Sequence, residues 1–240
     1  MRFDIHTHIL PSVDDGARDE ECTTRMLHLA AVSGTTHIVA TPHFACGIEG
    51  NTLKDIKVKF NQIRKEWKSF SEKNEFYLGN ELLYGEGLVD ALNRGEAMTM
   101  NETRYVLVEF PVYSDYAYVK RAVQNLNYAG YWPILAHIER YDCLRKTEHI
   151  KELIHVGACM QVNADTVLGK NGFFVKHYIL KLIKNSLVHF VASDAHSSRQ
   201  RRPELKSCMD YLNKKVGTVK TAQLFRINPR KMLKGEMLDG

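Results

Sequence analysis

The sequence predicts an α/β fold in which parallel strands form a closed or nearly closed barrel. Apolar, β-prone segments recur along the chain, and segments with helical spacing separate them. Such alternation is typical of parallel strands joined by right-handed crossovers. Seven repeats within 240 residues favour a barrel over an open doubly wound sheet. No glycine-rich phosphate loop follows the first strand, which argues against a Rossmann or P-loop protein.

The expected strands are short segments rich in β-branched and aromatic residues. Residues 36–41 and 105–109 are typical, because such residues make up most of each segment. The complete set of expected strands comprises residues 2–6, 36–41, 76–81, 105–109, 133–137, 158–162 and 188–193.

The expected helices carry apolar residues at every third or fourth position. The clearest pattern covers residues 52–70, where the apolar positions are Leu53, Ile56, Phe60, Ile63, Trp67 and Phe70. Further helices are expected over residues 18–33, 115–129 and 147–156. A glycine follows each of these three, in the position of a left-handed C-terminal cap, at Gly34, Gly130 and Gly157.

The composition is that of a soluble globular protein, with 25% charged and 44% hydrophobic residues. No linker or internal repeat divides the chain, so a single domain over residues 1–240 is predicted. No apolar run approaches the roughly 20 residues of a transmembrane helix, and the N-terminus lacks a signal-peptide pattern. The five cysteines are odd in number and form no Cys-x-x-Cys pair, which favours the reducing cytoplasm.

The charge balance gives a weak indication about partners. A net charge of +5 favours anionic partners, although the basic residues are spread along the chain. No motif that combines aromatic and basic residues stands out, so no nucleic-acid partner is expected.

Potential metal ligands gather at one end of the expected strands, and the active site of an α/β barrel lies at that end. His6 and His8 close the first strand, and side chains two residues apart on a strand point the same way. Neutral imidazole is a common ligand of transition metals. The same pattern recurs at other strand ends, with His43, Glu81, Glu109, His137, and Asp194 with His196. Randomly placed histidines and carboxylates would not favour one end.

Glu109 ends an apolar run, where burial of an unpaired carboxylate would cost free energy and a bound metal would remove that cost. Other positions have an alternative interpretation. Asp14 and Asp15 precede Gly16, so one of them is a ligand or the pair forms an ordinary turn or helix cap. Cys46 is interpreted as a loop residue rather than a ligand.

The donor set exceeds the needs of one ion. Nine nitrogen and oxygen donors are more than one zinc requires and suffice for two or three metals that share a carboxylate. Manganese, iron and zinc all suit such donors. Arg140, close to His137, is a candidate phosphate clamp, with a surface salt bridge to Glu139 or a neighbour as the alternative. Arg201 or Arg202 is a second candidate.

A series of short motifs runs through essentially the whole chain in order: His6-Thr7-His8-Ile9-Leu10-Pro11, Val13-Asp14-Asp15-Gly16, Ala40-Thr41-Pro42-His43, Gly79-Asn80-Glu81, Val108-Glu109-Phe110-Pro111, Ala136-His137-Ile138-Glu139-Arg140-Tyr141, Ala192-Ser193-Asp194-Ala195-His196 and Asn228-Pro229 at the start of a last helix. Together they resemble the bacterial capsule-associated tyrosine phosphatases of the PHP (polymerase and histidinol phosphatase) superfamily. The His-x-His motif alone would cover many amidohydrolases.

The resemblance implies a PHP-type distorted (β/α)7 barrel with a trinuclear, usually manganese-dependent site, and iron or zinc stay alternatives. It implies Arg140 as a phosphate-binding residue. A second family arginine follows the Asp-x-His motif and usually precedes proline. Arg202 matches that dipeptide with Pro203 and Arg201 matches the spacing, so both stay candidates. The implied metal ligands are His6, His8, Asp15, His43, Glu81, Glu109, His137, Asp194 and His196.

The predicted activity is hydrolysis of phosphotyrosine by a metal-activated hydroxide that attacks phosphorus. By resemblance, the substrate is the tyrosine-rich tail of an autophosphorylating bacterial tyrosine kinase in capsular polysaccharide synthesis. A cysteine phosphatase is excluded, because no cysteine is followed six residues later by arginine.

Two other functions compete with this prediction. One is another PHP phosphomonoesterase, of the histidinol-phosphate type, against which the short chain and the absence of long insertions count. The other is a non-catalytic metal-binding regulatory module, against which the complete ligand set counts.

Overall fold

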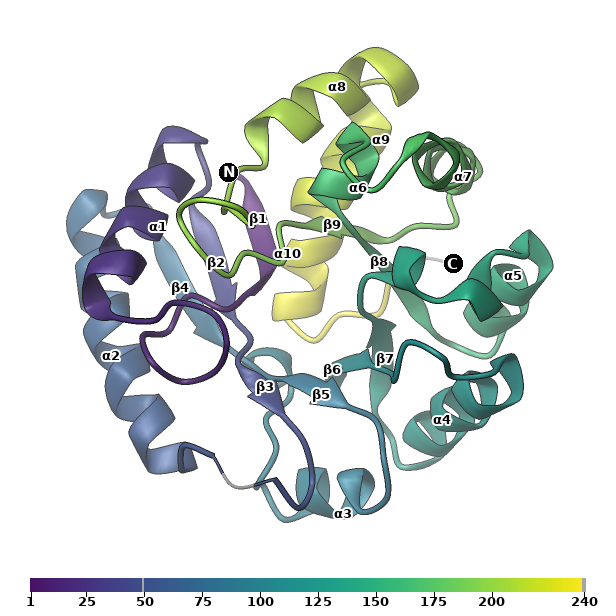
Figure 1. Ribbon diagram of the computed structural model, residues 1–240, viewed down its shortest axis with the longest axis horizontal. Helices are drawn as coiled ribbons and strands as arrows, with labels where there is room; N and C mark the ends of the chain where they lie inside the picture. The colour runs from purple at the N-terminus through teal and green to yellow at the C-terminus, as the bar shows by residue number, and fades with distance from the viewer. Residues whose placement is uncertain (49, 239–240) are drawn as a thin grey trace.

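Helices surround a group of parallel strands in the computed structural model, which describes residues 1–48 and 50–238 (Figure 1). One sheet has the strand order β1 (Phe3–Thr7), β2 (His37–Ala40), β4 (Glu75–Leu78). The other has the order β3 (His43–Phe44), β5 (Glu81–Leu83), β6 (Tyr105–Glu109), β7 (Trp132–Leu135), β8 (Cys159–Asn163), β9 (Phe190–Ala192). Neighbouring strands pair in parallel throughout both sheets.

Two of the expected strands are interrupted, which corrects the sequence-based assignment. The strand expected over residues 36–41 ends at Ala40, and His43 begins the separate strand β3. Pro42 lies at this break, and proline has no N–H to continue a strand ladder. The strand expected over residues 76–81 ends at Leu78, and Glu81 begins β5. The side chain of Asn80 joins the two breaks, because its amide donates to the Pro42 carbonyl at 2.8 Å.

The barrel closes where the chain around β9 meets β1. Thr7 pairs with Ala195 in an isolated parallel bridge. The Asp194 amide donates to the His6 carbonyl at 2.9 Å, and the His8 amide donates to the Ala195 carbonyl at 2.8 Å. The predicted closed or nearly closed α/β barrel is therefore confirmed.

The expected helices are confirmed to within about two residues at each end. Thr52 and Asp55 form a capping box at the start of α2. The expected left-handed caps are present, with φ of 76° at Gly34, 87° at Gly130 and 98° at Gly157. None of the described helices is long and apolar enough to cross a bilayer. The helices are α1 (Glu20–Val32), α2 (Leu53–Phe70), α3 (Leu88–Asn93), α4 (Tyr116–Tyr128), α5 (Thr147–His155), α6 (Ala164–Leu168), α7 (Phe173–Lys184), α8 (Lys206–Val216), α9 (Thr218–Ala222) and α10 (Asn228–Leu233), with short 3₁₀ turns η1 (Met100–Glu102), η2 (Ile138–Arg140) and η3 (Asp142–Leu144) and the π-helical turn η4 (Gln223–Ile227).

The core has an outer and an inner part, and the inner part leaves one end of the barrel to polar residues. Outside the strands, apolar faces of the helices pack on the sheets, as Trp67 of α2 does beside β2 and β4. Inside, Phe3, Leu107 and Phe190 pack together with Met232 of α10. α10 thereby covers the N-terminal ends of the strands, and the candidate ligands lie at the C-terminal ends.

Candidate metal centre

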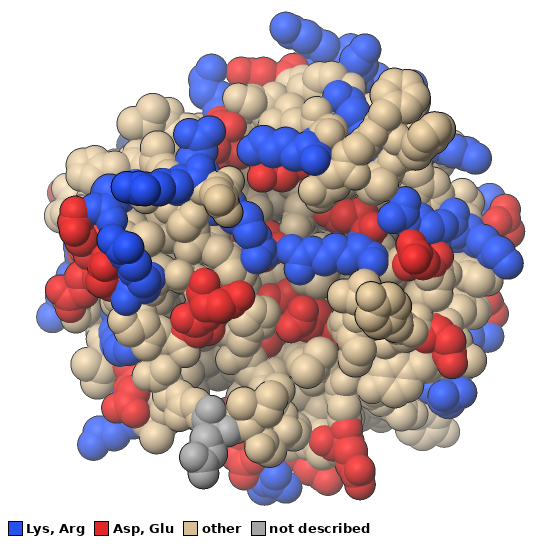
Figure 2. Space-filling view, viewed as in Figure 1, with Lys and Arg blue, Asp and Glu red and all other residues tan. Residues whose placement is uncertain are grey.

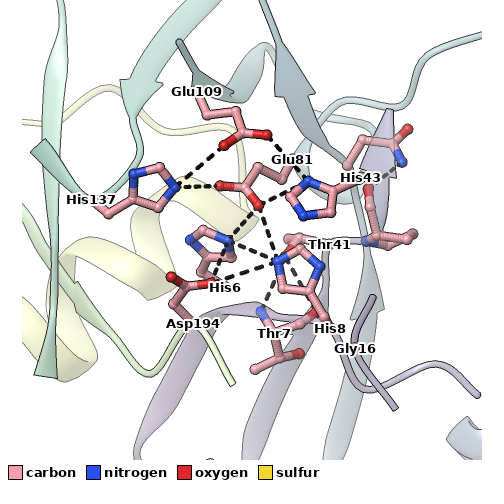
Figure 3. A network of polar contacts seen from close by, with 12 residues as sticks. His6, Thr7, His8, Gly16, Thr41, His43, Glu81, Glu109, His137 and Asp194 are labelled. Carbon is pink, nitrogen blue, oxygen red and sulfur yellow. Dashed lines mark hydrogen bonds and ion pairs between the residues drawn. The ribbon is translucent and has the colours of Figure 1, made fainter. Parts of the chain in front are cut away.

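The structure brings all nine predicted ligands together at the C-terminal ends of the strands. Figure 3 shows seven of them, without Asp15 and His196. Their atoms form three overlapping groups in which the potential ligand atoms lie within 4.8 Å of one another. The first group contains His6, His8, Glu81 and Asp194; the second contains His8, Asp15, His43 and His196; the third contains His43, Glu81 and Glu109. His137 joins through Glu81, since its Nε2 lies 2.7 Å from Glu81 Oε1.

A register shift in β1 directs the first two histidines into the site. Ile5 packs in the inner core with Phe3, yet His6, the next residue, lines the site. In a regular strand neighbouring side chains point to opposite sides, so Ile5 and His6 would not both face the inside of the barrel. The pairing of β1 with β2 shifts between Asp4 and Thr7, as in a β-bulge, which allows both side chains to face inward. Bulges often redirect side chains beside active sites.

Two of the candidate ligands hold a left-handed backbone that non-glycine residues rarely adopt. φ is 32° at His137 and 53° at Asp194. Each such residue costs about 1–3 kcal/mol, so its surroundings must fix it. The His137 amide donates to Gln161 Oε1 at 2.8 Å, and the Asp194 amide is held by the His6 carbonyl. Strained residues of this kind cluster at functional sites.

Glu81 is the centre of the arrangement. Its Oε2 lies 3.1 Å from His6 Nε2, 3.0 Å from His8 Nε2 and 3.3 Å from His43 Nδ1. Its side chain comes from the start of β5 and is almost completely buried. A carboxylate in contact with this many imidazoles would be able to hold a metal ion together with them.

Asp15 and Glu109 lie at the more open edge of the site. Asp15 Oδ1 is 3.3 Å from His43 Nε2 and 3.4 Å from His196 Nε2. Glu109 Oε1 is 3.2 Å from His43 Nδ1. The Asp15 side chain is 67% exposed, whereas that of Glu81 is 1% exposed, so the site is open to solute on the Asp15 side.

The electrostatics of these residues fit a bound cation. Burial disfavours charge on His6 and His8, but neighbouring carboxylates outweigh it and raise the pKa of each to about 9. Burial also disfavours charge on Glu81, and the charge of His6 nevertheless holds the pKa of Glu81 well below its ordinary value. Protons on the imidazoles thus balance the carboxylates, and a metal ion would have to displace them.

One buried oxygen supports the same conclusion. Asp194 Oδ1 is buried and has no hydrogen-bond partner among the described residues. It lies 3.4 Å from His6 Nε2, within the first ligand group. An unsatisfied buried carboxylate oxygen is costly unless a ligand such as a metal ion satisfies it. The residues present therefore fit divalent metal ions. No cysteine takes part in the three groups, and Cys46 lies in a turn after β3, as expected.

Two arginines lie beside the ligands. Arg140 donates to Asp194 Oδ2 at 2.6 Å, and Arg201 contacts the same oxygen. Arg202 is exposed, so the structure places Arg201 rather than Arg202 at the site. The alternative of a pair between Arg140 and Glu139 is wrong, because Glu139 is buried and its Oε1 accepts from the Asn163 amide and the Thr166 hydroxyl.

Sequence reasoning did not predict two contacts that would orient candidate ligands. Asp14 Oδ2 lies 2.7 Å from His8 Nδ1, on the side of the ring opposite the first ligand group. Burial opposes charge on Asp14, but the contact with His8 lowers its pKa to about 2. Gln161 Oε1 lies 3.2 Å from His6 Nδ1. A signal for Gln161 existed, since it is a polar residue within the expected strand 158–162, which lacks a ligand of its own.

We expect Asp14→Asn to weaken metal binding by about 10- to 100-fold, which is the usual effect of losing a residue that orients a ligand. The amide cannot supply the negative charge that holds the His8 ring. Metal titration followed by calorimetry measures the change, with Asp142→Asn, at a 96% exposed carboxylate, as the control. Unchanged affinity in Asp14→Asn would show that Asp14 does not orient His8.

Comparison with known proteins points to one family. A family model described as "Capsular polysaccharide synthesis, CpsB/CapC" matches residues 2–234. The tyrosine-protein phosphatase CpsB of Streptococcus pneumoniae is 32% identical over 242 residues, which cover 98% of this chain and 100% of that protein. The putative tyrosine-protein phosphatase CapC of Staphylococcus aureus is 34% identical over 204 residues, which cover 85% of this chain and 80% of that protein.

A solved structure of a tyrosine phosphatase is also similar to this chain. It comes from work on YwqE of Bacillus subtilis and CpsB of Streptococcus pneumoniae, which are described as unique metal-dependent tyrosine phosphatases. The TM-score is 0.90 at 29% sequence identity, and the match covers 99% of this chain and 96% of that one. The similarity therefore extends over the barrel and the candidate site together.

Proposed function

Because this chain belongs to the CpsB/CapC family of capsular polysaccharide synthesis, we propose that it is a metal-dependent protein-tyrosine phosphatase. The observation that carries the proposal is the combination of a multi-metal donor set with two arginines at its edge. Metal ligands alone would fit many hydrolases, whereas guanidinium groups beside them suit a phosphoryl group.

The proposed ligands are the nine residues predicted from the sequence, with Glu81 at their centre, where it contacts three of the histidines. When bound, the metal ions supply Lewis-acid stabilisation of the phosphoryl oxygens and lower the pKa of water toward neutrality. We propose two or three ions, with manganese preferred and iron or zinc as alternatives. Imidazole and carboxylate donors without thiolates support that choice.

The residues of the chain itself bind and orient the substrate. Arg140 and Arg201 are placed to donate hydrogen bonds to the phosphoryl oxygens, which gain charge in the transition state. Asp194 holds both guanidinium groups at the edge of the site. The phenol of tyrosine, with a pKa of about 10, leaves more readily than an alkoxide, so a strong general acid is less necessary.

The proposed physiological substrate is a phosphotyrosine protein of capsule synthesis, namely the tail of a bacterial tyrosine autokinase. The names of the relatives and of the family support this choice. We also propose a cytoplasmic location, which the five free cysteines support.

A substrate panel tests the proposed function. Protein reconstituted with Mn²⁺ is assayed with a phosphotyrosine peptide, an aryl phosphate and histidinol phosphate. We expect kcat/KM to be at least about tenfold higher for the phosphotyrosine peptide than for histidinol phosphate, because contacts with the substrate side chain commonly discriminate between substrates by at least that factor. The reverse order would favour a phosphatase of the histidinol-phosphate type. No turnover of any of the three would favour a non-catalytic module.

A further inference from the structure

A polar cavity of about 360 Å³ lies directly beside the metal centre. Arg140 and Arg201 form its border with the metal ligands, since both also contact Asp194. Its remaining lining includes Arg145, Asn171 and Asp165. Figure 2 shows basic side chains next to acidic ones over the hollowed centre of this face. We call this cavity the arginine pocket.

The arginine pocket has an excess of positive charge that solutes can reach. The side chains of Arg140, Arg145 and Arg201 are 38%, 38% and 37% exposed. Two carboxylates also line the pocket, but neither offsets the arginines fully. Asp165 is paired with Lys170 at 2.7 Å, and the Glu139 carboxylate is buried and accepts hydrogen bonds from the Asn163 amide and the Thr166 hydroxyl.

Arg140 and Arg201 are both paired with Asp194, whereas the described contacts of Arg145 are with other residues. One of its N–H groups donates to the Glu139 carbonyl at 3.2 Å. The carboxylate of Asp142 lies 3.7 Å away and is 96% exposed, so this ion pair is weak. A guanidinium has five N–H donors, which leaves Arg145 able to bind a carboxylate or phosphate in a fork.

The walls of the arginine pocket are fixed in place by Glu139. Its Oε1 accepts from the Asn163 amide and the Thr166 hydroxyl, both at 2.8 Å. These bonds tie η2 to the start of α6. The Glu139 carbonyl also accepts from Arg145, so the position of that arginine is coupled to the same buried residue. A rigid frame of this kind lowers the entropy lost on binding.

We propose that the arginine pocket is a substrate subsite for a second anionic group, carried by the phosphoprotein next to its phosphotyrosine. The group is an oxyanion, either the carboxylate of an acidic residue or a further phosphate, and Arg145 is the residue that selects it. While Arg140 and Arg201 bind the phosphoryl group under attack, Arg145 binds the neighbouring anion. This inference rests on the proposed phosphotyrosine phosphatase activity.

Peptides that share one phosphotyrosine and differ in its flanks test the subsite. One peptide has neutral flanks, a second has glutamates, a third has a second phosphotyrosine, and a fourth has lysines. We expect kcat/KM of the wild-type protein to be about fivefold higher for one or both of the anionic peptides than for the neutral one, as for a partly exposed charge pair of about 1 kcal/mol. The second and third peptides distinguish a carboxylate from a phosphate as the preferred group.

Variants of Arg145 assign the preference to the pocket. In Arg145→Ala the ratio of kcat/KM between anionic and neutral peptides should fall toward 1, and in Arg145→Glu the lysine-flanked peptide should be preferred. Arg121→Ala, at an exposed position of α4, should keep the wild-type ratio. Because the readout is a ratio between substrates, it does not depend on the fraction of folded enzyme.

Two outcomes would overturn the subsite: equal kcat/KM for all flanks in the wild-type protein, or an anionic preference that persists in both Arg145 variants. Failure of the wild-type protein to hydrolyse any of the four peptides would instead contradict the proposed phosphatase activity. The two failures are therefore distinguishable in the same experiment.

Discussion

Glu81→Gln is expected to lower kcat/KM toward a phosphotyrosine peptide by more than about 10²-fold, because it would weaken the binding of the metal ions that stabilise charge in the transition state. Glu81 contacts the imidazoles of His6, His8 and His43 through a single oxygen. Glutamine has nearly the same volume but carries no charge, so it would hold cations less strongly. Steady-state kinetics at saturating Mn²⁺, together with metal analysis of the purified variant, measures the loss.

The matched control is Glu86→Gln, which makes the same chemical change at an exposed position a few residues along the chain. It should retain wild-type activity and metal content. A Glu81→Gln variant with full turnover and full metal content would contradict the central role of Glu81. Circular dichroism of both variants separates a loss of metal from a loss of fold.

Chelation is expected to abolish phosphotyrosine hydrolysis, whereas alkylation of thiols should leave it intact. The ligand groups contain no cysteine, and burial raises the pKa of Cys143 and Cys208, which makes both thiols less reactive. The protein is treated with a chelator, passed through a desalting column and assayed before and after addition of Mn²⁺. A second sample is alkylated with iodoacetamide in its metal-loaded form.

Activity should fall to the background rate after chelation and return on addition of metal. The reason is that the imidazoles and carboxylates of the site suit metal ions, and the proposed mechanism uses no cysteine nucleophile. Inactivation of the metal-loaded enzyme by iodoacetamide would contradict this mechanism. Full activity after chelation, with no metal found by elemental analysis, would contradict it as well. Zn²⁺ or Fe²⁺ in place of Mn²⁺ identifies which ion supports turnover.

The position of the candidate site followed from local patterns in the sequence. His6, Glu109 and Asp194 each lie at or just beyond the end of an apolar segment. In a barrel of parallel strands all such ends face the same way, so position along the chain is enough to bring the residues together. The helix ends were predictable for a similar reason, because glycine caps act within a few residues of the helix that they end.

The sequence by itself therefore determined the barrel, the end at which the site lies and the identity of its candidate ligands. The tertiary structure alone decided where the strands break, which of Arg201 and Arg202 reaches Asp194, and which residues orient the histidines. It also decided that Arg145 joins the arginines beside the metal centre. These features depend on contacts between distant segments, such as that between His6 and Gln161, which lie 155 residues apart. Strand and helix periodicity carries information about neighbours in the chain, whereas such contacts arise only when the closing barrel brings separate strands together.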